Sequence, residues 1–375
     1  MKRRRVPRPA RGAARLAFAA ALAGAAAGAH AQAADAAWQL QAHYEHHLDG
    51  APLKLFDSDT LWQTIRPRPG DNLAYVLDQV DVTRRSGDWS VSLLARERGE
   101  VVLNRDALEA ARAIDGVDPT SSAHWTVRAS AFAFVGGGLG VAHDWRPAQS
   151  WRLRTGVQLL ALTRVIDRRI TGWGSYDATT RSYDADLHST EANDRLKFPF
   201  ERSHASIGQA LLSDGELGWQ AGVDGAAASL RWQDVGLLQW RGLPQQRETL
   251  SNQLTQHDAN GFVVYQPLVQ GQNTQDRWRR WSIPLTEAEA VTPDTAAGRW
   301  AVGARYRPGA AWLPRIGARQ APGEWHLSED WHLHERRADL AVARAGWRVS
   351  AGADLHSSHH SLTWGLAWSS ADTPR

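Results

Sequence analysis

The chain has 375 residues, no cysteine, 19 tryptophans and a formal net charge of +3. A chain without cysteine can form no disulfide and cannot be anchored through a lipid-modified cysteine. The first 34 residues carry seven basic and no acidic side chains, so the remainder has a charge of about −4, and a nucleic-acid-binding function loses its electrostatic basis.

The N-terminus has the three parts of a secretory signal peptide. Lys and Arg residues precede an uninterrupted run of Ala, Leu, Phe and Gly from Leu16 to Ala29, and small residues suited to cleavage follow. We predict a signal peptide over residues 1–33, cleaved after Ala31 or Ala33, and a single domain over residues 34–375. No later apolar run approaches the ~20 residues of a membrane-spanning helix.

Apolar and polar residues then alternate, and this pattern places every second side chain on the same face of a β-strand. In the first half the alternation predicts strands over residues 38–48, 73–83, 89–98, 125–135 and 151–165. Arg105 to Ile114 instead repeats apolar residues at helical spacing and ends before Gly116, which predicts a short helix. The glycines of 136–140 continue as a strand, so they indicate a bend in a sheet rather than a phosphate-binding loop.

The second half is interrupted by two long polar stretches, residues 167–202 and 242–298, which we interpret as loops. Strands are predicted over 206–212, 218–228 and 229–240, with one more at 262–269 inside the second stretch. Regular alternation returns over 300–307, 311–318, 325–335 and 339–345.

The chain closes with an amphipathic hairpin, residues 347–370. Trp347, Val349 and Leu355 share the apolar face of its first arm, and Leu362, Trp364, Leu366 and Trp368 form that of the second. Each arm has about ten residues, the length of a tilted strand that crosses a bilayer. The same alternation also occurs in the outer hairpin of a soluble β-sandwich.

Together, the signal peptide, the ten-residue amphipathic strands, the long polar loops and the Trp-rich last strand resemble those of Gram-negative outer-membrane β-barrel proteins. The resemblance implies an all-β fold, an antiparallel transmembrane β-barrel with long polar outer loops, and the candidate strands number about 12 to 14. It also implies location in the outer membrane, a channel, transport or structural role without a cofactor, and three partners: outer-membrane lipid, the barrel assembly machinery and a small solute. One departure is that Trp368 is not terminal, because residues 369–375 follow it.

Two sets of residues are candidates for function in such a barrel. Arginines opposite the apolar faces must avoid lipid, so we expect them to face the lumen, either as an anion-favouring passage or as a ladder paired with acids. They are Arg128, Arg152, Arg154, Arg305, Arg307 and Arg348. Aromatic residues at strand ends suit the membrane interface. They are Trp89, Trp125, Trp151, Trp300, Trp347, Trp364 and Trp368.

Three alternatives compete with this interpretation. A secreted β-sandwich could bind carbohydrate or another ligand through exposed Trp. A barrel lipase could use His204 and Ser206, which share a strand face, although residues 215–220 lack the partner Asn that the outer-membrane phospholipases carry. His332 and His334 also share a face and could bind a metal ion, but no carboxylate stands at a recognisable ligand spacing, so we expect no metal site.

Overall fold

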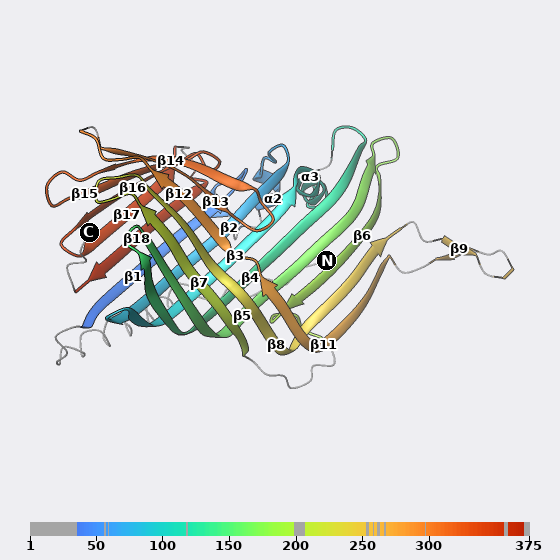
Figure 1. Cartoon of the computed structure of the whole chain (residues 1–375). Helices are drawn as coiled ribbons and strands as arrows, with labels where there is room; N and C mark the ends of the chain where they lie inside the picture. The colour runs from blue at the N-terminus through green and yellow to red at the C-terminus, as the bar shows by residue number, and fades with distance from the viewer. Residues whose placement is uncertain are drawn as a thin grey trace.

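The computed structural model describes residues 36–55, 58, 60–117, 119–198, 207–252, 255–257, 259–260, 263–265, 268–296, 298–355 and 359–370. The predicted signal peptide and the motif from His204 to Ser206 lie outside these residues. Strands dominate the described chain, and helices occur only in connections (Figure 1). None of the described helices has the length and apolar character needed to span a membrane.

The elements of the main sheet follow the chain in order. Its strands are β1 (Ala36–Leu48), β2 (Asp71–Ser86), β3 (Trp89–Asn104), β4 (Ala123–Ala148), β5 (Trp151–Asp177), β6 (Ser182–Asn193), β7 (Gly208–Gln220), β8 (Ala227–Ser251), β11 (Val269–Ser282), β12 (Leu285–Val291), β13 (Arg299–Tyr306), β14 (Trp312–Gln320), β15 (His326–His332), β16 (Arg337–Arg344), β17 (Trp347–Asp354) and β18 (Ser361–Ser369). The connections contain η1 (Leu53–Leu55), α2 (Leu61–Thr64), α3 (Arg105–Ile114) and the small hairpin β9 (Thr255–His257) and β10 (Val263–Tyr265).

The sheet closes on itself because the last strand pairs with the first. β18 runs antiparallel to β1, from Gln39 opposite Ser369 to His47 opposite Ser361. β6 and β7 follow one another along the same edges of β5 and β8, and β11 and β12 do so along β8, so each pair acts as one interrupted strand. The described residues therefore form a closed antiparallel barrel of 14 strands. The predicted fold class is confirmed, and the sandwich fold is wrong.

The two ends of the barrel differ. At the end that holds both Ala36 and Ser369, tight connections such as 87–88, 149–150 and 345–346 join the strands. We call this the turn end. At the opposite, loop end the connections include residues 49–70 and 105–122. The wall is also uneven: β4, β5 and β8 have 26, 27 and 25 residues, whereas β15 has 7.

The two polar stretches predicted as loops are largely strand, which corrects the sequence interpretation. β5 continues to Asp177 and returns as β6, while β8 continues to Ser251 and returns as β11. These segments extend beyond the apolar band, where neither face needs apolar residues, so alternation cannot reveal them. Residues 218–228 are also not one strand, because β7 ends at Gln220 and β8 begins at Ala227.

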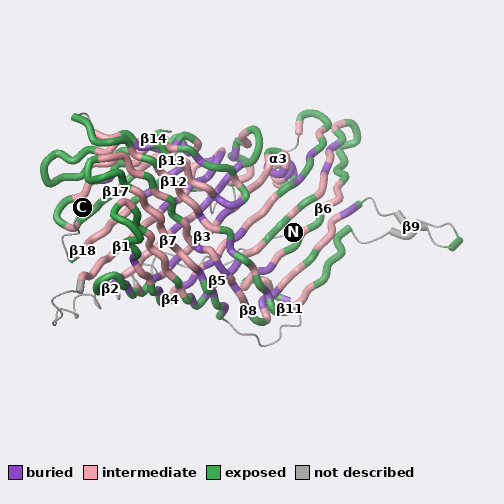
Figure 2. Tube along the Cα trace, in the orientation of Figure 1, coloured by how far each residue is buried: buried purple, intermediate pink, exposed green. Residues whose placement is uncertain are grey.

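Exposure alternates along the strands (Figure 2). Many of the exposed positions carry large apolar side chains, which form an outward-facing band. Leu139 of β4 and Leu159 of β5, which lie opposite each other, are 60% and 61% exposed. On β5 the band runs from Trp151 to Ala161, about 33 Å of strand, and a tilt of about 40° gives a height of ~25 Å. That height matches the apolar band of an outer-membrane barrel.

Aromatic side chains mark one end of the apolar band, and a pair of polar side chains marks the other. At the turn end the exposed side chains of Trp89, Trp151, Trp300 and Trp347 stand at strand starts, and Trp368 packs 6.1 Å from Trp347. Toward the loop end, on the same outward face, His46 of β1 and Asp78 of β2 form an ion pair 2.9 Å long. Trp364, 46% exposed, stacks on Tyr44 just inside this limit.

The predicted helix is present as α3, and it packs on the outside of the wall. Asn104 caps its N-terminus by accepting a hydrogen bond from the Ala107 amide. The apolar face of α3 covers Trp125 and Val127 of β4, which share the outward face of the strand. The prediction of an interfacial Trp125 is therefore wrong: its side chain is 5% exposed beneath α3. The same packing places α3 outside the lumen.

The glycines of 136–140 continue β4 as a strand, and an irregularity of the sheet lies beside them. The register between β4 and β5 shifts at Val135 and Gly136, leaving Thr163 of β5 as the extra residue of a β-bulge. The backbones approach closely there, because a Cβ on Gly138 would collide with the carbonyl oxygen of Leu159. Glycine is required at this position for a steric reason.

Candidate functional site: the barrel interior

The turn end of the barrel encloses a polar cavity of about 750 Å³. Inward-facing side chains from all around the barrel line it, including Gln39, Gln79, Ser90 and Ser350. Side chains of a strand alternate between its two faces. The polar residues that line the cavity therefore alternate along their strands with residues that face outward.

Five of the six arginines predicted to face the lumen line the cavity. They are Arg152, Arg154, Arg305, Arg307 and Arg348. Arg128 does not. It lies opposite Thr171 toward the loop end of β4 and is exposed there, outside the cavity. The alternation gives the correct strand face for Arg128 but does not indicate how far along the wall it lies.

Near the turn end, the buried carboxylate of Asp144 gathers three arginines. Arg152 lies 2.8 Å and Arg154 3.6 Å from its oxygens. Arg85 of β2 approaches the same carboxylate at 3.2 Å. Three guanidinium groups therefore share the Asp144 carboxylate, while Glu216 lies opposite Arg154 on β7 and Asp81 lines the same cavity.

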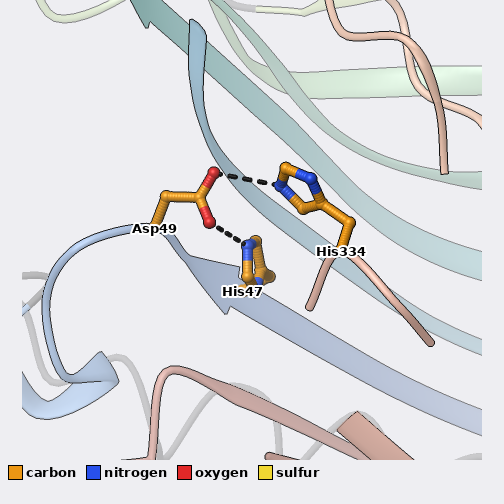
Figure 3. A group of neighbouring side chains, drawn as sticks. All are labelled: His47, Asp49 and His334. Carbon is orange, nitrogen blue, oxygen red and sulfur yellow. Dashed lines mark hydrogen bonds and ion pairs between the residues drawn. The ribbon is translucent and has the colours of Figure 1, made fainter. Parts of the chain in front are cut away.

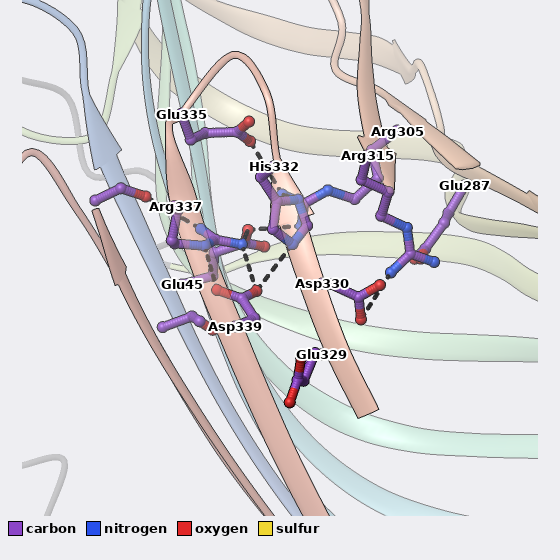
Figure 4. Close-up of polar contacts among 12 residues, drawn as sticks. Glu45, Glu287, Arg305, Arg315, Glu329, Asp330, His332, Glu335, Arg337 and Asp339 are labelled. Carbon is purple, nitrogen blue, oxygen red and sulfur yellow. Dashed lines mark hydrogen bonds and ion pairs between the residues drawn. The ribbon is translucent and has the colours of Figure 1, made fainter. Parts of the chain in front are cut away.

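Deeper in the barrel, a group of charged side chains surrounds Glu45 of β1 (Figure 4). The Glu45 carboxylate accepts hydrogen bonds from Arg305 at 2.6 Å, Arg307 at 2.7 Å and Arg337 at 2.8 Å. Two further residues complete the group, which we call the Glu45 cluster. Tyr75 hydrogen-bonds to both Glu45 and Glu335 at 3.0 Å, and Arg305 also reaches Glu335 at 3.0 Å. Burial strengthens these contacts electrostatically and makes an unpaired member costly.

A second buried group, the Asp234 cluster, joins β3 to β7 and β8 inside the barrel. Its members are Asp234, Arg96, Arg98, Glu100 and Asp214. Asp234 forms ion pairs with both Arg96 and Arg98 and is fully buried. Its φ of 65° and the register shift between β7 and β8 identify a β-bulge, which turns the carboxylate inward.

Together the clusters and neighbouring leucines fill the interior. Arg96 and Arg98 are 2% and 1% exposed, and Leu160, Leu212 and Leu238 are no more than 1% exposed beside them. A separate cavity of about 830 Å³ lies at the loop end, lined by residues such as Arg68 and His334. Among the described residues, the Glu45 cluster lies between the two cavities, because Glu45, Arg305 and Arg337 line the first and Glu335 lines the second.

Sequence reasoning found the arginines of the turn-end cavity but missed most acids that hold them. Arg96, Arg98 and Glu100 share the inward face of β3, and continuing the alternation of that strand could have identified them. Asp234 gives no such signal, since its bulge reverses the alternation.

The loop end holds the described residues most suited to a metal ion: His47, Asp49 and His334. His332 and His334 do not share a strand face as predicted: His332 ends β15 and contacts Asp339 at 2.9 Å inside the barrel, whereas His334 lies in the connection that follows. Burial alone would raise the pKa of Asp49, but the hydrogen bonds from His334 and His47 outweigh it and lower this pKa. The bond to Asp49 raises the pKa of His334.

No protein-family model matches this sequence, and no curated protein sequence matches it. Among solved structures, the toluene transporter TbuX of Ralstonia pickettii is similar over 90% of both chains, with 10% identity and a TM-score of 0.40. The toluene transporter TodX of P. putida is similar over 92% of both chains, with 7% identity and a TM-score of 0.41. The translocator domain of the autotransporter NalP from Neisseria meningitidis gives 9% identity and a TM-score of 0.29, over 95% of this chain and 97% of that one. The assignment of a barrel rests on the strand pairing of this chain, not on these matches.

Proposed function

We propose that this chain is an outer-membrane β-barrel with a channel or transport role, whose lumen is closed at rest by the Glu45 and Asp234 clusters. The observation that carries the proposal is a closed 14-stranded barrel with an apolar outer band and a polar cavity inside. In this view the signal peptide directs export, and the barrel assembly machinery inserts the mature chain.

The outer band favours a membrane over an aqueous compartment. Side chains such as Val157 and Leu159, 55% and 61% exposed, would form a contiguous apolar surface in water. Soluble monomers rarely expose apolar patches beyond a few hundred Å², whereas lipid accommodates this surface without penalty.

Fractionation tests the location. We expect the mature protein in the outer-membrane fraction, released by detergent but not by osmotic shock or high salt, because the apolar band holds it in lipid. Recovery with the soluble periplasmic proteins would exclude a membrane barrel.

The substrate class follows from the turn-end cavity. The arginines at Asp144 outnumber its single charge, so we propose that a small anion or a polar solute with an anionic group enters there. Fixed guanidinium groups in a narrow passage raise the local anion concentration.

The test uses a background variant that conducts ions. Replacing both Arg152 and Arg154 with Gln in that background should shift the reversal potential toward cation preference. Asp144 would then keep only Arg85 as its arginine partner, because this part of the wall would have lost two positive charges. Planar-bilayer recording in a salt gradient measures this shift. Replacing Arg128, which lies outside the cavity, serves as the control and should leave the potential unchanged. Equal potentials for the conducting variant with and without these two substitutions would remove these arginines from selectivity.

We propose no catalytic role. Neither buried cluster combines a nucleophile with a neighbouring base, since Glu45 and Asp234 are each engaged in ion pairs with arginines.

A further inference from the structure

Three side chains from two distant parts of the sequence meet at the loop end of the barrel (Figure 3). Nε2 of His47 lies 2.9 Å from Oδ1 of Asp49, and Nε2 of His334 lies 3.1 Å from Oδ2 of the same carboxylate. The three ligand atoms lie within 4.8 Å of one another. His47 ends the inward face of β1, Asp49 follows that strand, and His334 lies in the connection between β15 and β16.

We propose that His47, Asp49 and His334 form a binding site for a divalent transition-metal ion, with Zn²⁺ as the best match. Two imidazole nitrogens and one carboxylate are common zinc ligands. In a tetrahedral shell with ligands about 2.0 Å from the ion, neighbouring ligand atoms are about 3.3 Å apart. The two contacts across Asp49 are close to this spacing and use its two different oxygens. An ion would replace the two shared protons and draw the two imidazole nitrogens, which lie within 4.8 Å of each other, together around it.

The surrounding groups hold the carboxylate in place. The Leu73 amide donates to Oδ2 of Asp49 at 2.9 Å, and Arg68 forms an ion pair with Oδ1. Such outer contacts orient metal-binding carboxylates in known sites. Asp49 is 1% exposed, and the fixed position reduces the conformational cost of binding.

The charges around the site and the tautomer of His47 also permit a metal ion to bind. Arg68 adds a positive charge beside the site, but the carboxylate of Glu335, 1% exposed, adds a negative one next to His334. Arg305 lies 3.0 Å from this carboxylate and holds it in place beside the site. Nδ1 of His47 has no hydrogen-bond partner among the described residues. Moving the ring proton to this nitrogen would therefore free Nε2 without breaking a hydrogen bond there.

An ion can reach the site from the loop end. His334 and Glu335 line the cavity of about 830 Å³, and the side chain of His334 is 31% exposed. A water from this cavity would complete the coordination shell, as in zinc sites with three protein ligands. The site is separated from the turn-end cavity by the Glu45 cluster, so metal binding does not depend on transport.

The test is Zn²⁺ binding to the full mature chain in detergent after treatment with a chelator. Competition against a chromophoric chelator at about pH 7.5 should give one Zn²⁺ per chain, with affinity falling toward about pH 5.5 because the histidines must lose their protons. In His334→Gln the amide can still donate to Asp49, but the nitrogen lone pair that binds metal is lost. We expect at least a tenfold loss of affinity, and no increase of the unfolding temperature with saturating Zn²⁺.

His360→Gln is the matched control, because His360 lines the same cavity but is not a ligand. It should bind Zn²⁺ as the parent does. His334 is half-buried, so its variant folds more readily than one at the fully buried His47. Absence of Zn²⁺ binding, or equal affinities for the parent and His334→Gln, would overturn the proposal and leave a purely hydrogen-bonded group.

Discussion

Replacing Glu45 with Gln is expected to convert a closed barrel into a conducting and less stable one. The parent protein should insert into a planar bilayer without steady ion current, because the buried clusters block the lumen. In the variant, Arg305, Arg307 and Arg337 lose their shared counter-charge and repel one another. Removing one partner of a buried ion pair costs about 3–5 kcal/mol, and water entering to solvate the arginines would open a path. Single-channel recording and urea unfolding measure the two effects.

Glu216→Gln is the control for this result. Glu216 also lines the cavity and pairs with Arg231 at 3.1 Å, but the two side chains are 39% and 58% exposed. An exposed pair contributes about 0–1 kcal/mol, so this variant should stay closed and stable. If Glu45→Gln inserts normally and remains as closed as Glu216→Gln, the Glu45 cluster does not close the lumen, and a structural role for the barrel is favoured.

Val157→Arg is expected to prevent stable assembly in the membrane. Val157 points outward from the middle of the apolar band and is 55% exposed. An arginine on the lipid face near the bilayer midplane costs about 2–4 kcal/mol. The amount of folded, heat-modifiable barrel in the outer-membrane fraction measures the effect, and Leu366→Arg on β18 should behave in the same way.

The adjacent substitution Gln158→Arg provides the control. Gln158 faces the lumen, where its amide donates to Asp214 at 2.5 Å, and an arginine there could pair with the same carboxylate. We expect nearly normal assembly. Similar losses for both substitutions would show that the inward and outward faces of β5 are assigned incorrectly.

The sequence by itself determined the local features of this protein. Alternation over ten or more residues, as in residues 151–161, specifies both a strand and its apolar face, because the side-chain period of a strand is 2. The helix from Arg105 to Ile114 was likewise predictable, since its spacing and its cap are written in consecutive residues. The inward face of Arg152 and Arg154 followed from the same period.

Only the tertiary structure decided which charges meet. Glu45 contacts Arg305 and Arg337 across 260 and 292 positions of the sequence, and these contacts exist because closure of the sheet brings β1 beside the last strands. His47 and His334 converge on Asp49 for the same reason. Bulges add a second limit: one extra residue reverses the alternation, so the inward carboxylate of Asp234 cannot be read from its neighbours. Sequence periodicity describes one strand at a time, whereas the contacts between charged side chains inside the barrel depend on the register between strands.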